Sequence, residues 1–191
     1  MKGKFVLVVG TSGSGKNTLI DHVKPLFPEV VYAKSCVTRA PRPNEDATYR
    51  YFLSTDEFRE KVNSDEFLEW AEYGGNLYGT LRSEVMSHVE AGKVVLKELE
   101  VQGARQIRER MDKERLYIVF INAGSWDEVE ARIKARAPIS DEELLKRKAH
   151  YDDEMSFMDE ADTVILNKTG EVERAKKDFE DVIRTIVQGA A

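Results

Sequence analysis

Short apolar runs alternate with amphipathic segments along most of the chain. The runs are rich in β-branched residues and predict strands at residues 5–9, 30–33, 93–99, 116–121 and 163–166. The segments between them repeat apolar residues at helical spacing and predict helices over residues 18–27, 84–90, 102–111, 126–136, 141–158 and 171–187. Strands alternating with helices indicate crossover connections. The pattern therefore predicts an α/β fold with a central parallel sheet flanked by helices.

Residues 49–78 follow a different pattern. Segments of β character at 49–53 and 67–73 flank a helical segment near 56–62, which predicts a small appended lobe. We expect one compact unit with three parts. These are a core of residues 1–34, 81–125 and 160–191, a lobe of residues 35–80, and a lid region of residues 126–159.

Composition narrows the class of protein. The chain of 191 residues is 41% hydrophobic and has one cysteine, Cys36, so no internal disulfide is possible. No apolar run approaches the roughly 20 residues of a membrane span, and the run at 5–9 is too short for a secretory signal. We expect a cytoplasmic protein that does not bind membranes. The net charge of −6 argues against general nucleic-acid binding.

The first predicted strand leads into a glycine-rich loop that matches G-x-x-x-x-G-K and opens the next helix. Glycines let backbone N–H groups point inward at phosphate oxygens, and the lysine adds a point charge. A chance glycine-rich turn is the alternative, but the strand, spacing, lysine and helix all favour a phosphate site. The residues predicted to contact ATP here are Gly10, Thr11, Ser12, Gly13, Ser14, Gly15, Lys16, Asn17 and Thr18.

One position departs from the motif. A Ser or Thr hydroxyl usually follows the lysine and ligates Mg²⁺, whereas this chain has Asn17 followed by Thr18. An amide oxygen can ligate a hard cation, and an Asn at a helix start can also act as a cap. Asn17 is therefore a candidate both for a metal ligand and for a helix cap. We expect Mg²⁺ to be held mostly by phosphates and water, with these two residues as candidate ligands.

Two further features point to an acceptor site. Arg39 and Arg42 stand three residues apart in an extended, proline-containing segment, and planar guanidinium forks suit phosphate, although such pairs are more often solvated. Glu69 interrupts an apolar Phe-Leu-Glu-Trp run, where burial requires donors. The N1–H and 2-amino groups of guanine would supply them. A solvent-facing strand residue is the alternative for Glu69.

Taken together, these segments resemble the guanylate kinase family of P-loop nucleoside monophosphate kinases over residues 10–167. Besides the loop, the resemblance rests on Ser35 with the Thr-Arg-Ala-Pro-Arg run at 38–42, Glu-Phe-Leu-Glu-Trp at 66–70, Asn-Leu-Tyr-Gly-Thr at 76–80 and Val-Gln-Gly-Ala at 101–104. It implies ATP- and Mg²⁺-dependent phosphorylation of GMP, and of dGMP, in purine nucleotide metabolism. The partners implied are the nucleotides ATP and GMP, with no obligate protein partner.

The resemblance also implies roles for individual residues. Arg39, Arg42 and Tyr78 would hold the GMP phosphate, and Ser35, Glu69 and Thr80 would read the guanine edge. The family's further phosphate-binding tyrosine falls in a segment that is one residue shorter than usual. Tyr49 and Tyr51 are both candidates, and Tyr51 is preferred because it directly precedes the well-matched Phe52.

The predicted strand at 93–99 ends in Glu98-Leu99-Glu100, where the family typically has an acidic-x-Asp pattern. Strand alternation would put Glu98 and Glu100 on one face, at the sheet edge that borders the ligand crevice. We therefore expect both near GMP. The extra methylene of Glu100 would displace its carboxylate by about 1 Å, which matters for positioning. Two exposed carboxylates are the alternative.

A helix break at Ala137-Pro138 separates Arg132 and Arg136 from Arg147 and predicts a lid that closes over ATP and excludes water. Solvated arginines are the alternative. By resemblance, Arg136 and Arg147 contact the transferring phosphates, Arg132 lies near the nucleotide, and Asn167 lies near the adenine. The expected catalytic residues are Lys16, Arg39, Arg136 and Arg147.

Two other functions compete with this one. A ribose bisphosphate kinase of the same fold would give Glu69 no base to read. A non-catalytic guanylate-kinase-like module that binds phosphorylated peptides usually lacks loop or lid residues, whereas this chain keeps Lys16 and all three lid arginines.

Overall fold

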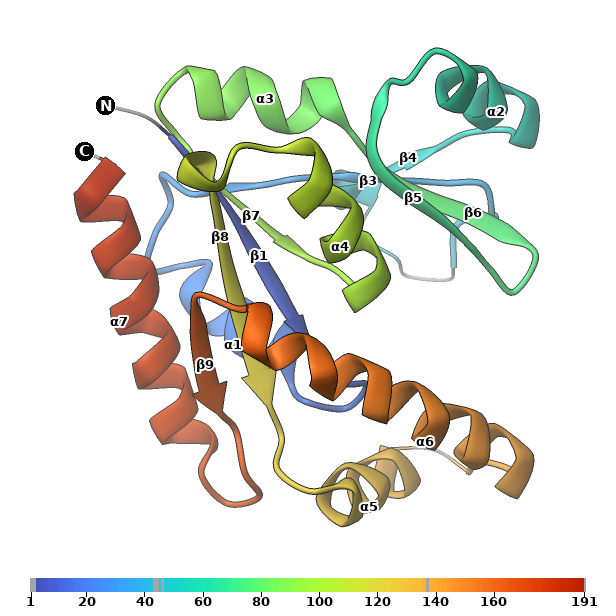
Figure 1. Ribbon diagram of the computed structural model, residues 1–191, viewed down its shortest axis with the longest axis vertical. Helices are drawn as coiled ribbons and strands as arrows, with labels where there is room; N and C mark the ends of the chain where they lie inside the picture. Colours follow the sequence, from blue (N-terminus) through green and yellow to red (C-terminus); the bar gives the residue numbers. More distant parts are fainter. Residues whose placement is uncertain (1–2, 43–44, 46, 137, 191) are drawn as a thin grey trace.

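A parallel five-stranded sheet in the order β2-β7-β1-β8-β9 forms the centre of the protein. The computed structural model describes residues 3–42, 45, 47–136 and 138–190. All four pairs of neighbouring strands are parallel. The predicted central sheet flanked by helices is therefore confirmed (Figure 1). The strands are β1 (Lys4–Gly10), β2 (Val31–Tyr32), β7 (Val94–Glu98), β8 (Leu116–Asn122) and β9 (Thr163–Leu166).

Helices cover both faces of this sheet, so the apolar run from Phe5 to Val9 in β1 is buried throughout. Val6 and Val8 belong to a core cluster on the side of α1 and α7, and Leu7 belongs to the cluster on the side of α3 and α4. Alternate side chains of one strand thus pack into two separate cores. The helices are α1 (Lys16–Val23), α7 (Val172–Ala190), α3 (Arg82–Glu90) and α4 (Val101–Arg110).

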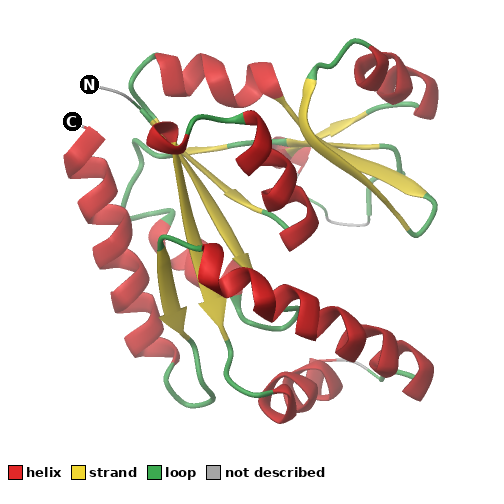
Figure 2. Cartoon of the chain, viewed as in Figure 1, coloured by secondary structure: helices red, strands yellow, loops and turns green. Residues whose placement is uncertain are grey.

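A second sheet, of four strands in the order β4-β3-β6-β5, forms a lobe at one side of the core (Figure 2). It carries one helix, α2 (Thr55–Asn63), which starts with a capping box between Ser54 and Glu57. Strand β6 was not predicted, because its polar and glycine residues break the apolar pattern and its pairing with β5 is what makes it a strand. The strands are β3 (Ser35–Val37), β4 (Arg50–Phe52), β5 (Phe67–Tyr73) and β6 (Asn76–Leu81).

Two helices follow β8 on the opposite side from the lobe: α5 (Trp126–Arg136) and α6 (Asp141–Ser156). As predicted, α5 ends at Arg136 before Pro138, and residue 137 lies outside the described residues. The helix predicted through residue 158 ends at Ser156 and continues as a 3-10 turn, Phe157–Glu160, because Phe157 turns into the core and is fully buried there.

Other boundaries also differ from the prediction. The helix predicted at 18–27 begins at Lys16, directly from the glycine loop, and ends at Val23. Its last predicted residues form a turn in which the Val23 carbonyl accepts from the N–H groups of Leu26 and Phe27. None of the helices in the described part of the chain is long and apolar enough to cross a membrane.

We expect Phe179→Ala to lower the free energy of unfolding by about 3–5 kcal/mol, because this fully buried ring anchors α7 on the sheet and its removal leaves a cavity. The matched control is Lys177→Ala, an exposed position on the same helix, which should change stability by less than about 0.5 kcal/mol. Urea unfolding followed by circular dichroism measures both. Equal midpoints for the two variants would contradict this account of the core.

Candidate active site

The glycine loop between β1 and α1 has a backbone that residues other than glycine rarely adopt. Gly10, Gly13 and Gly15 have φ angles of 151°, 81° and 88°, in the region that favours glycine. A Cβ on Gly10 would clash with the carbonyl oxygen of Ile121, and one on Gly15 would clash with the amide of Asn167. The loop is therefore pressed against the carboxyl ends of β8 and β9 and curls as a phosphate-binding loop requires.

Lys16 lies folded over this loop and is 7% exposed. Its Nζ donates to the carbonyls of Gly10 (2.7 Å) and Thr11 (3.3 Å) and lies 3.9 Å from a carboxylate oxygen of Glu98. Within the described chain, the buried hydroxyls of Thr11 and Ser14 have no hydrogen-bond partner. Unpaired buried polar groups cost about 1–3 kcal/mol each, so a bound anion would satisfy groups that the protein leaves unsatisfied.

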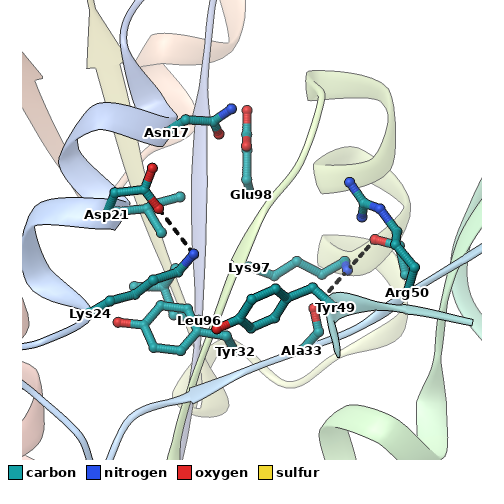
Figure 3. A pocket seen from close by; sticks show the side chains of 12 residues that line it. Asn17, Asp21, Lys24, Tyr32, Ala33, Tyr49, Arg50, Leu96, Lys97 and Glu98 are labelled. Carbon is teal, nitrogen blue, oxygen red and sulfur yellow. Dashed lines mark hydrogen bonds and ion pairs between the residues drawn. The ribbon is translucent and has the colours of Figure 1, made fainter. Parts of the chain in front are cut away.

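Asn17 extends from the first turn of α1 toward Glu98 (Figure 3). The amide orientation that satisfies both groups has the Asn17 nitrogen donating to the carboxylate. Burial and the charge of Glu100 raise the pKa of Glu98, and Lys16 opposes the shift. Thr18, the other candidate metal ligand, is exposed on the same turn.

Strand alternation does not relate Glu98 to Glu100, and that part of the prediction was wrong. β7 ends at Glu98, and Glu100 occupies the N-cap position of α4. The strand ends at Glu98 and α4 begins at Val101, so Glu100 lies in the short connection between strand and helix. The two carboxylates are nevertheless close enough for the charge of one to raise the pKa of the other.

Glu154 on α6 completes this acidic group and was missed from the sequence, where it is one of many acids in a charged helix. The residue is 9% exposed, and its carboxyl is hydrogen-bonded to Glu100 and to the backbone N–H of Ser12. Burial, and then the charge of Glu100, raise its pKa to about 7, while Lys16 and the Ser12 bond oppose the rise. The contact ties α6 to both the glycine loop and α4.

The arginines and Asn167 also reach the loop. Arg147 donates to the Ser12 hydroxyl at 3.0 Å, and Arg132 donates to the Asn167 carbonyl at 2.6 Å. The Asn167 amide in turn donates to the Ser14 carbonyl at 2.7 Å. Arg147 and Asn167 therefore contact the phosphate loop directly, and Arg132 is joined to it through Asn167. Arg136 is the last residue of α5, and its side chain lies outside the part that the structure describes.

Glu69 lies in the lobe, on β5, directly opposite Thr80 on β6. The carboxylate is 5% exposed and accepts from the Thr80 hydroxyl at 2.5 Å. Burial raises the pKa of Glu69, and the Thr80 hydrogen bond and the charge of Lys97 oppose this. A Cβ on Gly103 would lie 3.0 Å from a Glu69 oxygen, so a larger residue on α4 would have to displace the Glu69 carboxylate. Glu69 is thus an interior residue, not a solvent-facing one.

Arg39 already holds a carboxylate. Its guanidinium donates to both oxygens of Glu45, at 2.7 and 2.5 Å, and is also hydrogen-bonded to Tyr78. The Arg39 bonds, with a bond from the Arg42 backbone N–H, lower the pKa of Glu45 to about 2. The exposed Arg42 side chain is not part of this fork. Two anionic oxygens bound by one guanidinium are an arrangement that a phosphate can also adopt.

A cavity of about 290 Å³ lies between α1, the end of β7 and the lobe (Figure 3). Ser35, Tyr49, Arg50, Lys97 and Glu98 contribute to its lining. Arg50 and Lys97 were missed from the sequence, although a lysine inside an apolar strand run was a readable signal.

The two candidate tyrosines differ in their position relative to this cavity. Tyr49 lines it, whereas Tyr51 is 36% exposed and donates to Glu84 at 2.9 Å. The geometry thus shifts the preference from Tyr51 to Tyr49.

Comparison with known proteins agrees with this geometry. A family model described as guanylate kinase matches residues 2–186. The chain belongs to the guanylate kinase family. A guanylate kinase of Rubrobacter xylanophilus is 38% identical over 189 residues, which cover 98% of this chain and 97% of the relative. One of Streptomyces coelicolor is 40% identical over 169 residues, covering 88% and 85%. The crystal structure of guanylate kinase from Anaplasma phagocytophilum matches the fold with a TM-score of 0.70 at 23% identity, covering 97% of this chain and 87% of that one.

In this guanylate kinase family member, we expect Glu154→Gln to change how stability depends on pH. The folded pKa of Glu154, about 7, is above its unfolded value, so its contribution to stability is present at low pH and is lost as pH rises through 7. Gln cannot ionise. Relative to the unchanged protein, the variant should therefore be more stable by roughly 1–2 kcal/mol at about pH 8 than at about pH 5.

Urea unfolding at the two pH values measures this difference. Asp152→Asn, an exposed acid on the same helix, is the matched control and should show no such pH-dependent gain. A pH-independent difference for Glu154→Gln would show that Glu154 does not titrate as described.

Proposed function

We propose that this protein transfers the γ-phosphoryl group of ATP to GMP, giving ADP and GDP, and accepts dGMP as well. The observation that carries the proposal is the buried Glu69 in the lobe, which accepts from Thr80. Burial raises the pKa of Glu69, and the charge of Lys97, a residue that lines the cavity beside the phosphate loop's helix, lowers it. A guanine base offers N1–H and 2-amino donors to such a carboxylate, whereas the N1 of adenine is an acceptor. The membership in the guanylate kinase family supports the same reaction.

The donor site follows from the loop. Its inward N–H groups and Lys16 would hold the β- and γ-phosphates, with Lys16 exchanging the carbonyls of Gly10 and Thr11 for phosphate oxygens. Arg132, Arg136 and Arg147 would add positive charge from the lid. Phosphoryl transfer depends on positioning and on stabilisation of charge, so no protein nucleophile is required.

The acceptor site would use groups that bond to one another in this structure. GMP phosphate would replace the Glu45 carboxylate in the fork of Arg39, with Arg42, Tyr78 and one of the two tyrosines at 49 and 51 as further donors. Ser35, Glu69 and Thr80 would read the base. Glu98 and Glu100, at the end of β7, would border the nucleotide where the two substrates meet.

The oxygen-bearing groups near the loop fit Mg²⁺ bound together with ATP. The described residues contain no cluster of three or more His, Cys, Asp or Glu that could hold a metal. The ion would therefore be held mainly by phosphates and water, with the Asn17 amide oxygen and the Thr18 hydroxyl as candidate protein ligands. The ion would neutralise charge on the bridging phosphate oxygens.

We further propose that the lobe of residues 35–80 and the lid of residues 126–159 close on the core when both nucleotides bind. Helix α5 packs on the rest through a small apolar cluster of Ala123, Val129 and Ile133, and α6 makes polar contacts to the loop, whereas Phe157 near the end of the lid region is buried in the core. The limited contacts of the two helices suit a segment that moves about a fixed end. The single cysteine supports the expected cytoplasmic location.

The proposed function is tested by coupled ADP release with ATP and Mg²⁺ against GMP, dGMP, AMP, CMP and UMP. Because Glu69 needs a base with adjacent donors, kcat/KM for GMP should exceed that for AMP by about a hundredfold or more. Turnover with GMP no higher than with the other acceptors would exclude the proposal. It would then favour the related sugar-phosphate kinase or the binding module.

Glu69→Gln should lower kcat/KM for GMP by roughly 10–100-fold, since it replaces hydrogen bonds to a charged acceptor with weaker neutral ones. The KM for ATP should stay unchanged. Glu72→Gln, an exposed acid on the same strand, is the matched control and should behave like the unchanged protein. Equal losses for GMP and ATP would mean that Glu69 supports the fold and not the base.

A further inference from the structure

Lys97 is a charged residue where the fold predicts an apolar one. It follows Val94, Val95 and Leu96 in β7, the strand beside β1, and is only 4% exposed. Burying an ammonium is unfavourable unless hydrogen bonds and charges compensate for the lost water. The proposed reaction, as described above, assigns Lys97 no part, so its burial requires another explanation.

The Lys97 ammonium binds the segment that connects the two sheets. Nζ donates to the carbonyls of Ala33 (3.2 Å) and Lys34 (3.1 Å) and to the hydroxyl oxygen of Ser35 (2.8 Å). These residues lie where the chain leaves β2 and enters β3, and Figure 3 shows the Lys97 side chain directed from β7 toward Ala33. Lys97 therefore fixes the position of Ser35 at the junction between core and lobe.

The direction of the Ser35 hydrogen bond follows from the chemistry of the ammonium. An ammonium has three protons and no acceptor, and here each proton has its own partner. The Ser35 oxygen must therefore accept from Lys97, which leaves the hydroxyl proton to donate elsewhere. Within the described part of the chain, no acceptor takes that proton. Ser35 thus presents a donor to the cavity that it lines.

The same ammonium acts on Glu69. Burial raises the pKa of Glu69, and the groups that oppose this are the Thr80 hydroxyl and the charge of Lys97. Burial lowers the pKa of Lys97 to about 8, and Glu69 is the largest opposing charge. Three other groups face Lys97 from neighbouring elements: Arg50 on β4 lowers its pKa further, and Cys36 on β3 and Glu84 on α3 raise it.

We propose that Lys97 is a positioning residue for the acceptor base: it holds Ser35 with its hydroxyl proton directed to the substrate and keeps Glu69 ionised. This inference rests on the proposed function and adds a residue that sets its base specificity. A protonated Glu69 would direct its own proton toward the N1–H of guanine, so the site recognises a 6-oxopurine only while the carboxylate is charged.

The ionisation of Lys97 and Glu69 predicts how GMP binding depends on pH. As pH rises through about 8, Lys97 loses its proton and one of its three hydrogen bonds, so GMP binding weakens. As pH falls, Glu69 takes up a proton and binding weakens again. Without Lys97, the loss of GMP binding at high pH should disappear. The loss of GMP binding at low pH should begin at a higher pH, because Glu69 has lost its counter-charge.

The test compares Lys97→Met with the unchanged protein and with Lys93→Met, an exposed lysine next to the same strand. GMP is varied at saturating ATP and Mg²⁺ from about pH 6 to about pH 9. Lys97→Met should raise KM for GMP about tenfold near neutral pH, with kcat changed less than about threefold, the KM for ATP unchanged and the pH limbs altered as above. Lys93→Met should match the unchanged protein.

An unaltered KM and pH profile in Lys97→Met would overturn the inference, as would a loss of kcat at constant KM. If that variant does not fold, calorimetric titration of the unchanged protein with GMP decides between about pH 7.5 and about pH 8.5, where the phosphate is almost fully ionised and the guanine N1–H is still largely protonated. Affinity that falls across this range supports the inference, and constant affinity overturns it. Absence of any GMP turnover in the unchanged protein would refute the proposed function itself, which is a separate outcome.

Discussion

The close approach of the glycine loop to the ends of β8 and β9 is the constraint on which the rest of the site depends. Gly10 and Gly15 leave no room for a Cβ against Ile121 and Asn167. The loop is thereby held at the carboxyl edge of a parallel sheet, where the strands end together and α1 begins. Helix α6, the acidic group of Glu98, Glu100 and Glu154, and the cavity beside the lobe all lie around that edge. Ligand sites of open α/β sheets usually lie at the same edge.

The lid depends on the same loop. Arg147 and Glu154 on α6 both bond to Ser12, one through the side chain and the other through the backbone N–H. Glu154 also bonds to Glu100 at the start of α4. The lid helix is thus held by polar contacts to the groups that phosphates would engage, and an incoming nucleotide would exchange with them.

Several groups proposed to bind substrates are paired with other groups of the protein in this structure. Lys16 rests on loop carbonyls, Arg39 grips Glu45, and Glu69 accepts from Thr80. Each pair keeps a buried or half-buried charge from remaining uncompensated, and under the proposed function the partners of Lys16 and Arg39 would be exchanged for phosphate. Groups placed in advance contribute more to transition-state stabilisation than groups that must be recruited, because little reorganisation remains during the reaction.

The sequence alone determined the parallel α/β fold, the glycine-rich loop, the helix break before Pro138 and the unusual placement of Glu69 within an apolar run. These depend on local periodicity, on a contiguous motif, or on one acid within an apolar run, all of which can be read within a few residues.

The tertiary structure alone decided that β6 is a strand, that Glu100 occupies the N-cap position of α4, that Glu154 reaches the loop, and that Tyr49 lines the cavity. Pairing partners, burial and the charges around a carboxyl come from segments distant in the chain. No local pattern contains them, since they arise only when the two sheets and the lid pack together.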